Sequence, residues 1–203
     1  ISVDGKGFAG GVSNYYAGHG PGGGLYFASS PRKYGGSYGG AGINGEGVPI
    51  FATNTYGSAE RPLEPGSGGC AGSATNGIGG AGGGAVCITA DQVVVSGRIS
   101  ANGGLTSGQV HNSAGSGGGI YIVCRTIHGT NGSVTADAGL PRIVYNYNGG
   151  GAGGGRIAVH YDPDAQRALS VPALWFSVAP SASAPASLPD CIGEIGTLYF
   201  PDL

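Results

Sequence analysis

The sequence predicts an all-β protein, a glycine-rich parallel β-helix (solenoid) with long glycine-rich loop excursions. A glycine triplet recurs at residues 82–84, 117–119 and 153–155. A fixed period in this range is typical of repeat architectures, whose units bury their apolar faces against one another. Each triplet leads into a segment with the two-residue apolar period of a β-strand. No helical periodicity lies between these segments, which argues against a βαβ fold.

The composition excludes several other classes of protein. Glycine supplies 46 of the 203 residues, about three times its ordinary share of roughly 7%. It has no strict every-third spacing, so the chain is not collagen-like. Charged residues make up 10%, the net charge is −2, and Lys6 and Lys33 are the only lysines. With no basic patch and no long apolar run, we expect neither a nucleic-acid partner nor a membrane span.

The first 80 residues precede the three repeats. Residues 1–7 match the second strands of the later repeats, at 99–104 and 134–139, so the chain opens in the middle of a repeat. Residues 25–28 read as a short strand. Residues 29–80 form a long irregular excursion, which we expect glycine to order through close backbone packing.

The repeats have a definite strand register, because a one-residue slip would turn every side chain to the other face. We expect Cys124 to point inward and Cys87 outward. The middle repeat requires one residue fewer before its strand and one more at its turn, near residues 129–132. The predicted inward residues are Val86, Ile88, Ala90, Val93 and Val95, then Ile120, Ile122, Cys124 and Ile127, then Ile157, Val159 and Tyr161.

The composition changes after Tyr161, so we divide the chain into a glycine-rich β-solenoid domain (1–161) and a C-terminal extension (162–203). The extension contains a short helical turn at 162–169, a strand at 174–178, a Pro/Ala/Ser linker at 179–189 and a terminal strand at 195–200. An alternative geometry for the glycine tracts is a bundle of extended helices packed on a smaller sheet.

Cys70, Cys87, Cys124 and Cys191 are too widely spaced for a zinc site. Their even number is typical of two disulfides in an oxidising compartment, with Cys70–Cys87 slightly favoured, against the alternative of four buried thiols. Asn131-Gly-Ser is the N-glycosylation sequon, and it falls at a predicted turn.

A series of motifs in fixed order resembles a known family. The motifs include Gly5-Lys-Gly-Phe, Gly97-Arg-Ile-Ser-Ala-Asn-Gly, Gly153-Gly-Gly-Arg-Ile-Ala-Val-His-Tyr and Gly196-Thr-Leu-Tyr-Phe. By these motifs the chain is similar to the glycine-rich repeat modules of large secreted or cell-surface proteins of bacteria, algae and plants, over most of residues 1–161 and 193–200. The resemblance implies an extracellular, β-helical module with no catalytic residues to carry over. The chain departs from the pattern at Cys70, where glycine is expected, and in its linker.

The sequence predicts no enzyme, no catalytic residue, no cofactor and no metal site. Its four histidines are scattered, and its GxGxxG-like strings do not open a helix after a strand. Asp4, Asn102 and Asp137 occupy equivalent repeat positions and read as turn residues that bond nearby backbone N–H groups; a weak cation site along such a ladder is the alternative. Tyrosines among the glycines either stack on sugars or cap a core of small residues.

We therefore expect a structural protein of the cell surface, a self-assembling protomer of a filament or layer. Terminal strands of neighbouring copies would pair or stack. A carbohydrate-binding or adhesive module, with glycans as ligands, is the alternative, and a polysaccharide-degrading β-helix enzyme is a third. The predicted assembly residues are Ile1, Ser2 and Val3 at one end and Thr197, Leu198, Tyr199 and Phe200 at the other.

Overall fold

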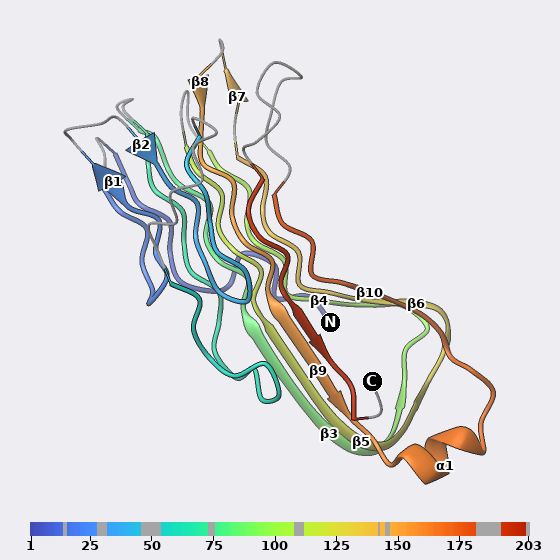
Figure 1. Cartoon of the computed structure of the whole chain (residues 1–203). Coiled ribbons are helices and arrows are strands. Elements are labelled where there is room, and N and C mark those ends of the chain that lie inside the picture. Colours follow the sequence, from blue (N-terminus) through green and yellow to red (C-terminus); the bar gives the residue numbers. More distant parts are fainter. Residues whose placement is uncertain are drawn as a thin grey trace.

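The protein consists of two small parallel sheets and a set of glycine-rich extended segments that lead into them (Figure 1). The computed structural model describes residues 1–13, 16–27, 32–45, 54–72, 76–107, 112–141, 143–144, 147–181 and 192–201. Its elements are β1 (Tyr26–Phe27), β2 (Arg32–Lys33), β3 (Ala85–Val94), β4 (Arg98–Ser100), β5 (Gly119–His128), β6 (Thr130–Thr135), β7 (Ile143–Val144), β8 (Tyr147–Asn148), β9 (Arg156–His160), α1 (Pro163–Arg167), β10 (Ala173–Ser177) and β11 (Thr197–Tyr199).

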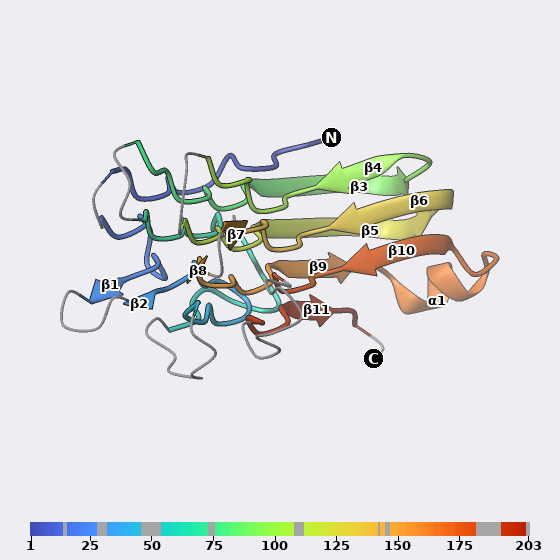
Figure 2. The same cartoon turned by 90° about the horizontal axis from the view of Figure 1, so that it is seen from above.

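The two main sheets are each entirely parallel. The β5 sheet has the strand order β11-β9-β5-β3, and the β6 sheet has the order β10-β6-β4. Each strand of the β5 sheet leads around a turn into the β6 sheet, except β11 (Figure 2). Two antiparallel pairs, β1-β2 and β7-β8, lie at the other end of the molecule (Figure 1).

The apolar core lies between these two sheets. Ile120, Ile122, Ile157 and Val159 reach it from the β5 sheet and are fully buried, as is Val134 from the β6 sheet. The alternation of apolar and other residues along each strand makes this possible, because successive side chains point to opposite faces.

The predicted register is confirmed. Val86 lies beside Ile120, and Ala90 lies beside Cys124 in the β3–β5 pair. Cys124 is buried and Cys87 is exposed, as expected. Of the predicted inward residues, Ile88 and Tyr161 are only partly buried and Ala90 is exposed. Ile88 and Ala90 lie on β3, which has a neighbour on one side only, so burial is incomplete there.

The glycine-rich segments form a bundle of extended chains. Successive N–H groups along a segment donate to different neighbours, and every third residue faces the same neighbour, as in the three-residue turn of polyproline II. The N–H groups of Gly79 and Gly82 donate to Gly11 and Phe8, and those of Gly80 and Gly83 donate to Ser113 and Ser116, at 2.8–2.9 Å. The peptide groups are therefore satisfied between segments and not within them.

Glycine is required where these segments touch. A Cβ added to Gly83 would lie 1.9 Å from the carbonyl oxygen of Ala101, and one added to Gly82 would lie 1.9 Å from that of Gly66. Such a bundle excludes side chains on the packed faces, since any Cβ would separate the backbones. The expectation that glycine orders the excursion by close backbone packing is confirmed over its described part.

The expected fold class, an all-β parallel β-helix, is wrong. The strands form two parallel sheets, and the described residues do not close into a solenoid. The glycine tracts supply the physical reason. They carry no side chains that could fill the inside of a coil, so they pack against one another as a bundle beside the sheets. The arrangement corresponds to the alternative geometry, extended glycine-rich chains packed on a smaller sheet.

The C-terminal part of the chain extends the same two sheets. β10 pairs with β6 and β11 pairs with β9, both in parallel. The expected helical turn is α1, whose first N–H groups are capped by the side chain of Asp162. Within the described part of the chain, no helix is long and apolar enough to cross a membrane.

Candidate assembly interface

The N-terminal residues act as a further strand of the β6 sheet. Ser2 forms a parallel bridge with Ser100, and the N–H of Val3 donates to the carbonyl of Ser100 at 2.8 Å. The predicted equivalence of residues 1–7 with the second strands of the repeats is therefore confirmed at this bridge. With residues 1–3 included, each sheet is four strands wide.

The stack consequently has two end faces, one on each side (Figure 2). The N-terminal end face carries the outer edges of β3 and of residues 1–3. The C-terminal end face carries the outer edges of β11 and β10. None of these edges pairs with another strand among the described residues. An edge of this kind presents a row of unpaired N–H and C=O groups.

The N-terminal end face contains an apolar groove of about 440 Å³ between β3 and β4. Its apolar lining includes Ile1, Ile88, Val93, Val95 and Ile99, and Gln92, Ser96 and Arg98 also line it. The side chain of Ile1 is 68% exposed at its rim. The groove exists because β3 has no outer neighbour that would cover the inward side chains of the first repeat.

The C-terminal end face is also apolar. Leu198 of β11 remains 45% exposed, although its partner Ile157 is fully buried. Phe200 packs edge-on against Phe176 of β10, with ring centroids 5.1 Å apart. A small cavity of about 120 Å³ lies beside these rings, toward α1. The apolar core between the two sheets is thus partly exposed at both end faces.

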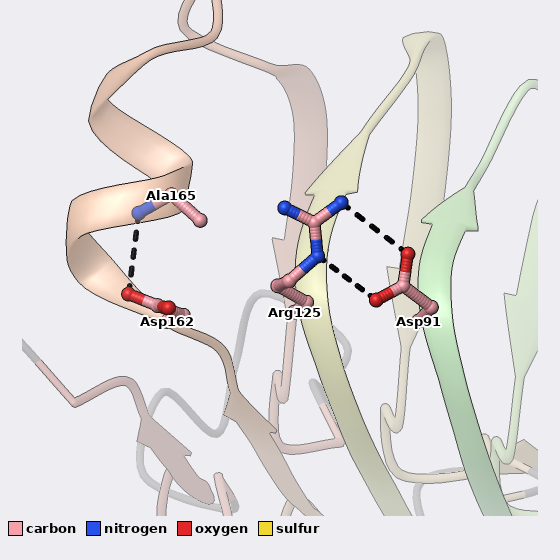
Figure 3. Close-up of polar contacts among 4 residues, drawn as sticks. All are labelled: Asp91, Arg125, Asp162 and Ala165. Carbon is pink, nitrogen blue, oxygen red and sulfur yellow. Dashed lines mark hydrogen bonds and ion pairs between the residues drawn. The ribbon is translucent and has the colours of Figure 1, made fainter.

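The edge strands carry almost no free charge. Asp91 is the charged side chain of β3, and it points toward the neighbouring strand, where Arg125 of β5 binds it with two hydrogen bonds of 2.9 and 3.3 Å (Figure 3). These bonds and the guanidinium charge lower the pKa of Asp91. β10, β11 and residues 1–3 contain no Asp, Glu, Lys or Arg. Exposed edges are commonly protected by charged side chains, and that protection is missing here.

A buried arginine fixes the position of β11. Arg156 of β9 is only 7% exposed. Its Nη1 donates to the hydroxyl of Thr197 at 3.0 Å, and its Nε donates to the carbonyl of Tyr56 at 3.0 Å. The guanidinium also lies over the ring of Tyr38, 5.5 Å from its centroid. Arg156 therefore ties the last strand of the sheet to the glycine-rich excursion.

The two tyrosines of this cluster are structural. Tyr38 is fully buried and its hydroxyl donates to Glu64, while the ring of Tyr56 lies 4.8 Å from that of Tyr38. Burial raises the pKa of Tyr38 well above its ordinary value and raises that of Tyr56 to about 12. Tyr38 is thus a core residue and Tyr56 is a partly buried residue packed against it, whereas Tyr16 is 62% exposed.

The aspartate and asparagine ladder bonds backbone groups. Oδ1 of Asp4 accepts the N–H of Asn102, and Oδ1 of Asn102 accepts the N–H of Asp137. Oδ1 of Asp137 then accepts the N–H of Ala179, so each side chain links one strand to the next. The described residues contain no cluster of three potential metal ligands.

The predicted disulfides do not form among the described cysteines. Cys70, Cys87 and Cys124 are free, and Cys191 lies outside the described residues. The favoured Cys70–Cys87 bridge is wrong because Cys70 is buried among glycine backbones while Cys87 lies exposed on the outer face of β3. Burial raises the pKa of the Cys70 thiol to about 12, which keeps it protonated and unreactive.

Asn131 lies at the start of β6, where the predicted extra turn residue occurs. It is exposed and has a positive φ of 57°, a conformation that asparagine tolerates better than most residues. The β6–β10 register shifts at this position. The amide is therefore accessible to a glycosylating enzyme, and its glycosylation stays a prediction.

The sequence predicted two of the four strand edges on the end faces and missed the other two. Residues 1–3 and 197–200 were the predicted assembly strands, whereas the outer edges of β3 and β10 also lie on the end faces. The signal for β3 was present, since its segment belongs to the first of the three glycine-led repeats. β10 gave no such signal, because its sequence does not resemble the repeats.

Comparison with family models, curated proteins and solved structures finds no match for this chain. The resemblance to secreted glycine-rich modules therefore stays a prediction, and the functional argument rests on the geometry of the end faces.

Proposed function

We propose that this protein is a structural protomer that assembles with copies of itself through its two end faces into an extracellular filament or surface layer. The observation that carries the proposal is that both sheets end on each side in bare strand edges. Each edge lies beside an exposed part of the apolar core, such as Ile1 or Leu198.

The length and chemistry of the edges support this proposal. β3 offers ten residues of edge, and its apolar groove is large. A long edge whose one charged side chain, Asp91, is paired with Arg125 and which lies next to apolar surface is a template for pairing with another chain. An interface that differs on its two sides gives a ring if the rotation between copies closes and an open fibre if it does not. The two end faces lie on opposite sides of the stack, so copies added along the stack produce a fibre.

Two observations support the extracellular location. It rests on the resemblance to secreted glycine-rich modules and on the exposed sequon at Asn131. The free thiols of the described cysteines give it no support.

Sedimentation velocity and electron microscopy of the purified chain test the proposal. We expect concentration-dependent assembly into long particles. Thr89→Pro removes a backbone N–H from the outer edge of β3. Successive residues of a strand direct their N–H and C=O groups to opposite sides. The carbonyl of Gly84 accepts a hydrogen bond from β5, so the N–H of Thr89, five residues later, points away from β5. This variant should fold and stay monomeric, while Thr89→Val should assemble. A wild-type chain that stays monomeric at every concentration would refute the proposal.

A second candidate function, glycan binding, has one observation in its favour. Tyr121, His160 and Tyr199 form a row of touching rings on the outer face of the β5 sheet, with centroids 5.0–5.4 Å apart. Aromatic rows of this kind can hold sugar rings. Binding to a glycan array that disappears in Tyr121→Ala and Tyr199→Ala would support this candidate, and an array without any signal would remove it.

A further inference from the structure

We propose that the copies join head to tail in a single register: β11 of one copy pairs in parallel with β3 of the next, and β10 pairs with residues 1–3 of the next. This inference rests on the proposed function, and it specifies the partner surface and the alignment of the joint.

The hydrogen-bond pattern of the β5 sheet repeats in a way that continues across the joint. At each step, the first N–H of a strand donates to the glycine carbonyl that precedes the neighbouring strand. Thr197 donates to Gly155 at 3.0 Å in the last step. The next member of the series is Ala85 of the following copy, donating to Gly196. The earlier steps are Gly119 to Gly84 at 3.1 Å and Arg156 to Gly118 at 3.0 Å.

The β6 sheet contains a second series with the same property. Its members are Val3 to Ser100, Ala101 to Thr135 and Ala136 to Ser177, all at 2.8 Å. The next member is Val178 donating to the carbonyl of Ser2 in the following copy. Pro180 has no N–H, so the ladder of the β6 sheet ends there and the joint extends no further along the glycine-rich segments.

A single translation of one copy relative to the next forms the hydrogen bonds of both series. Each sheet is four strands wide when residues 1–3 are counted. One displacement by four strand spacings, about 19 Å, therefore brings both pairs of edges together at once. A molecule with unequal sheets could satisfy only one edge by such a movement.

The side chains match in the same alignment. Val86, Ile120, Ile157 and Leu198 occupy one inward row across the β5 sheet. Leu198 would meet Val86 of the next copy. Two residues further along, Phe200 would enter the groove beside Ile88 of that copy. In the β6 sheet, Ile1 of the next copy would cover Phe176, whose row contains Val134 and Ile99.

The natural cysteine of β3 makes the register testable. Tyr199 and Cys87 occupy the same row of the β5 sheet, through Ala158 and Tyr121. In the proposed joint, residue 199 of one copy is the direct neighbour of Cys87 in the next. Their Cα atoms would be about 4.8 Å apart, within the range of roughly 4.4–6.8 Å that a disulfide spans.

The experiment uses the full chain with Cys191→Ser, assembled and then mildly oxidised with oxidised glutathione. Tyr199→Cys should give a ladder of disulfide-linked multimers on a non-reducing gel. Adding Cys87→Ser should abolish the ladder. Tyr121→Cys serves as the positive control, because residue 121 is the neighbour of Cys87 in the same chain and should form an internal bridge.

Each outcome decides a separate point. A ladder that requires Cys87 supports the register. If Tyr199→Cys forms filaments and Tyr121→Cys forms its internal bridge, but no ladder appears, the register is wrong while the assembly function stands. If the chain with Cys191→Ser alone does not assemble, the proposed function itself fails.

Discussion

Replacing Gly83 by alanine tests the glycine bundle most sharply. The new Cβ would lie 1.9 Å from the carbonyl oxygen of Ala101 and 2.6 Å from the nitrogen of Gly118. Because atoms at van der Waals contact lie about 3.5 Å apart, the backbones must separate by more than an ångström. That movement disrupts the bonds from Gly83 N–H to Ser116 at 2.9 Å and from Gly66 N–H to Gly83 at 2.8 Å.

The expected cost follows from these contacts. Overpacking costs about 1–3 kcal/mol, and each buried hydrogen bond left unmade costs about 1–3 kcal/mol. The lower entropy of the unfolded alanine chain returns about 0.4–1 kcal/mol. We therefore expect Gly83→Ala to lower the free energy of unfolding by roughly 3–6 kcal/mol, which corresponds to a Tm decrease of about 10 °C or more.

Gly97→Ala is the matched control, since a Cβ there has no neighbour within 4 Å. Denaturant unfolding monitored by circular dichroism, together with a thermal melt, compares the two variants. We expect Gly97→Ala to remain within about 1 kcal/mol of the wild type. Equal stability of Gly83→Ala and Gly97→Ala would refute the close packing of the glycine segments.

Three further predictions concern the rest of the molecule. Arg156→Ala leaves the carbonyl of Tyr56 and the hydroxyl of Thr197 without their donor, so we expect a loss of about 3–5 kcal/mol in denaturant unfolding; a loss below about 1 kcal/mol would contradict its role. Because the pKa of Tyr56 is raised to about 12, its contribution to stability is present below pH ~10 and is lost as the pH rises from about 10 to 12. Alkaline unfolding, followed by tyrosinate absorbance, should shift upward in Tyr56→Phe, and an unchanged midpoint would oppose this. Expression in a eukaryotic secretory host should add a glycan at Asn131, seen by mass spectrometry and absent from Ser133→Ala; an unmodified wild-type chain would contradict accessibility.

The register of the core could be read from the sequence because one side of each strand is buried. Ile120, Ile122 and Cys124 are buried and alternate with the partly buried Tyr121 and Val123, and this pattern tolerates no slip. The step at Asp91 and the added turn residue near Asn131 were also readable. The first appears as a change of phase along the strand of the first repeat, and the second as an extra residue at the turn of the middle repeat.

The prediction of a closed solenoid was wrong because the sequence does not show which segments the glycine-rich segments pack against. Where every position is glycine, the three-residue period of an extended helix leaves no trace in the sequence. The neighbours of Gly83 include Ala101, from the second strand of its own repeat, and Ser116, from the following repeat. Only the folded chain shows which segments adjoin.

The cluster around Arg156 could not be predicted from the sequence either. Its partners are the backbone carbonyls of Tyr56 and Tyr38, which any residue type would supply, and the distant Thr197.

The prediction of a Cys70–Cys87 disulfide was wrong for a related reason. An even number predicts pairing, but burial of Cys70 within the bundle and exposure of Cys87 on an edge strand keep them apart.

Electron microscopy of the assembled wild-type chain tests the central claim most directly, because the end faces prescribe the symmetry of the product. We predict polar filaments with an axial rise of about 19 Å per copy, the width of four strands. In such filaments, β11 and β3 of successive copies form one continuous sheet. Monodisperse monomers at all concentrations, or filaments in which copies meet through two identical faces, would contradict the account.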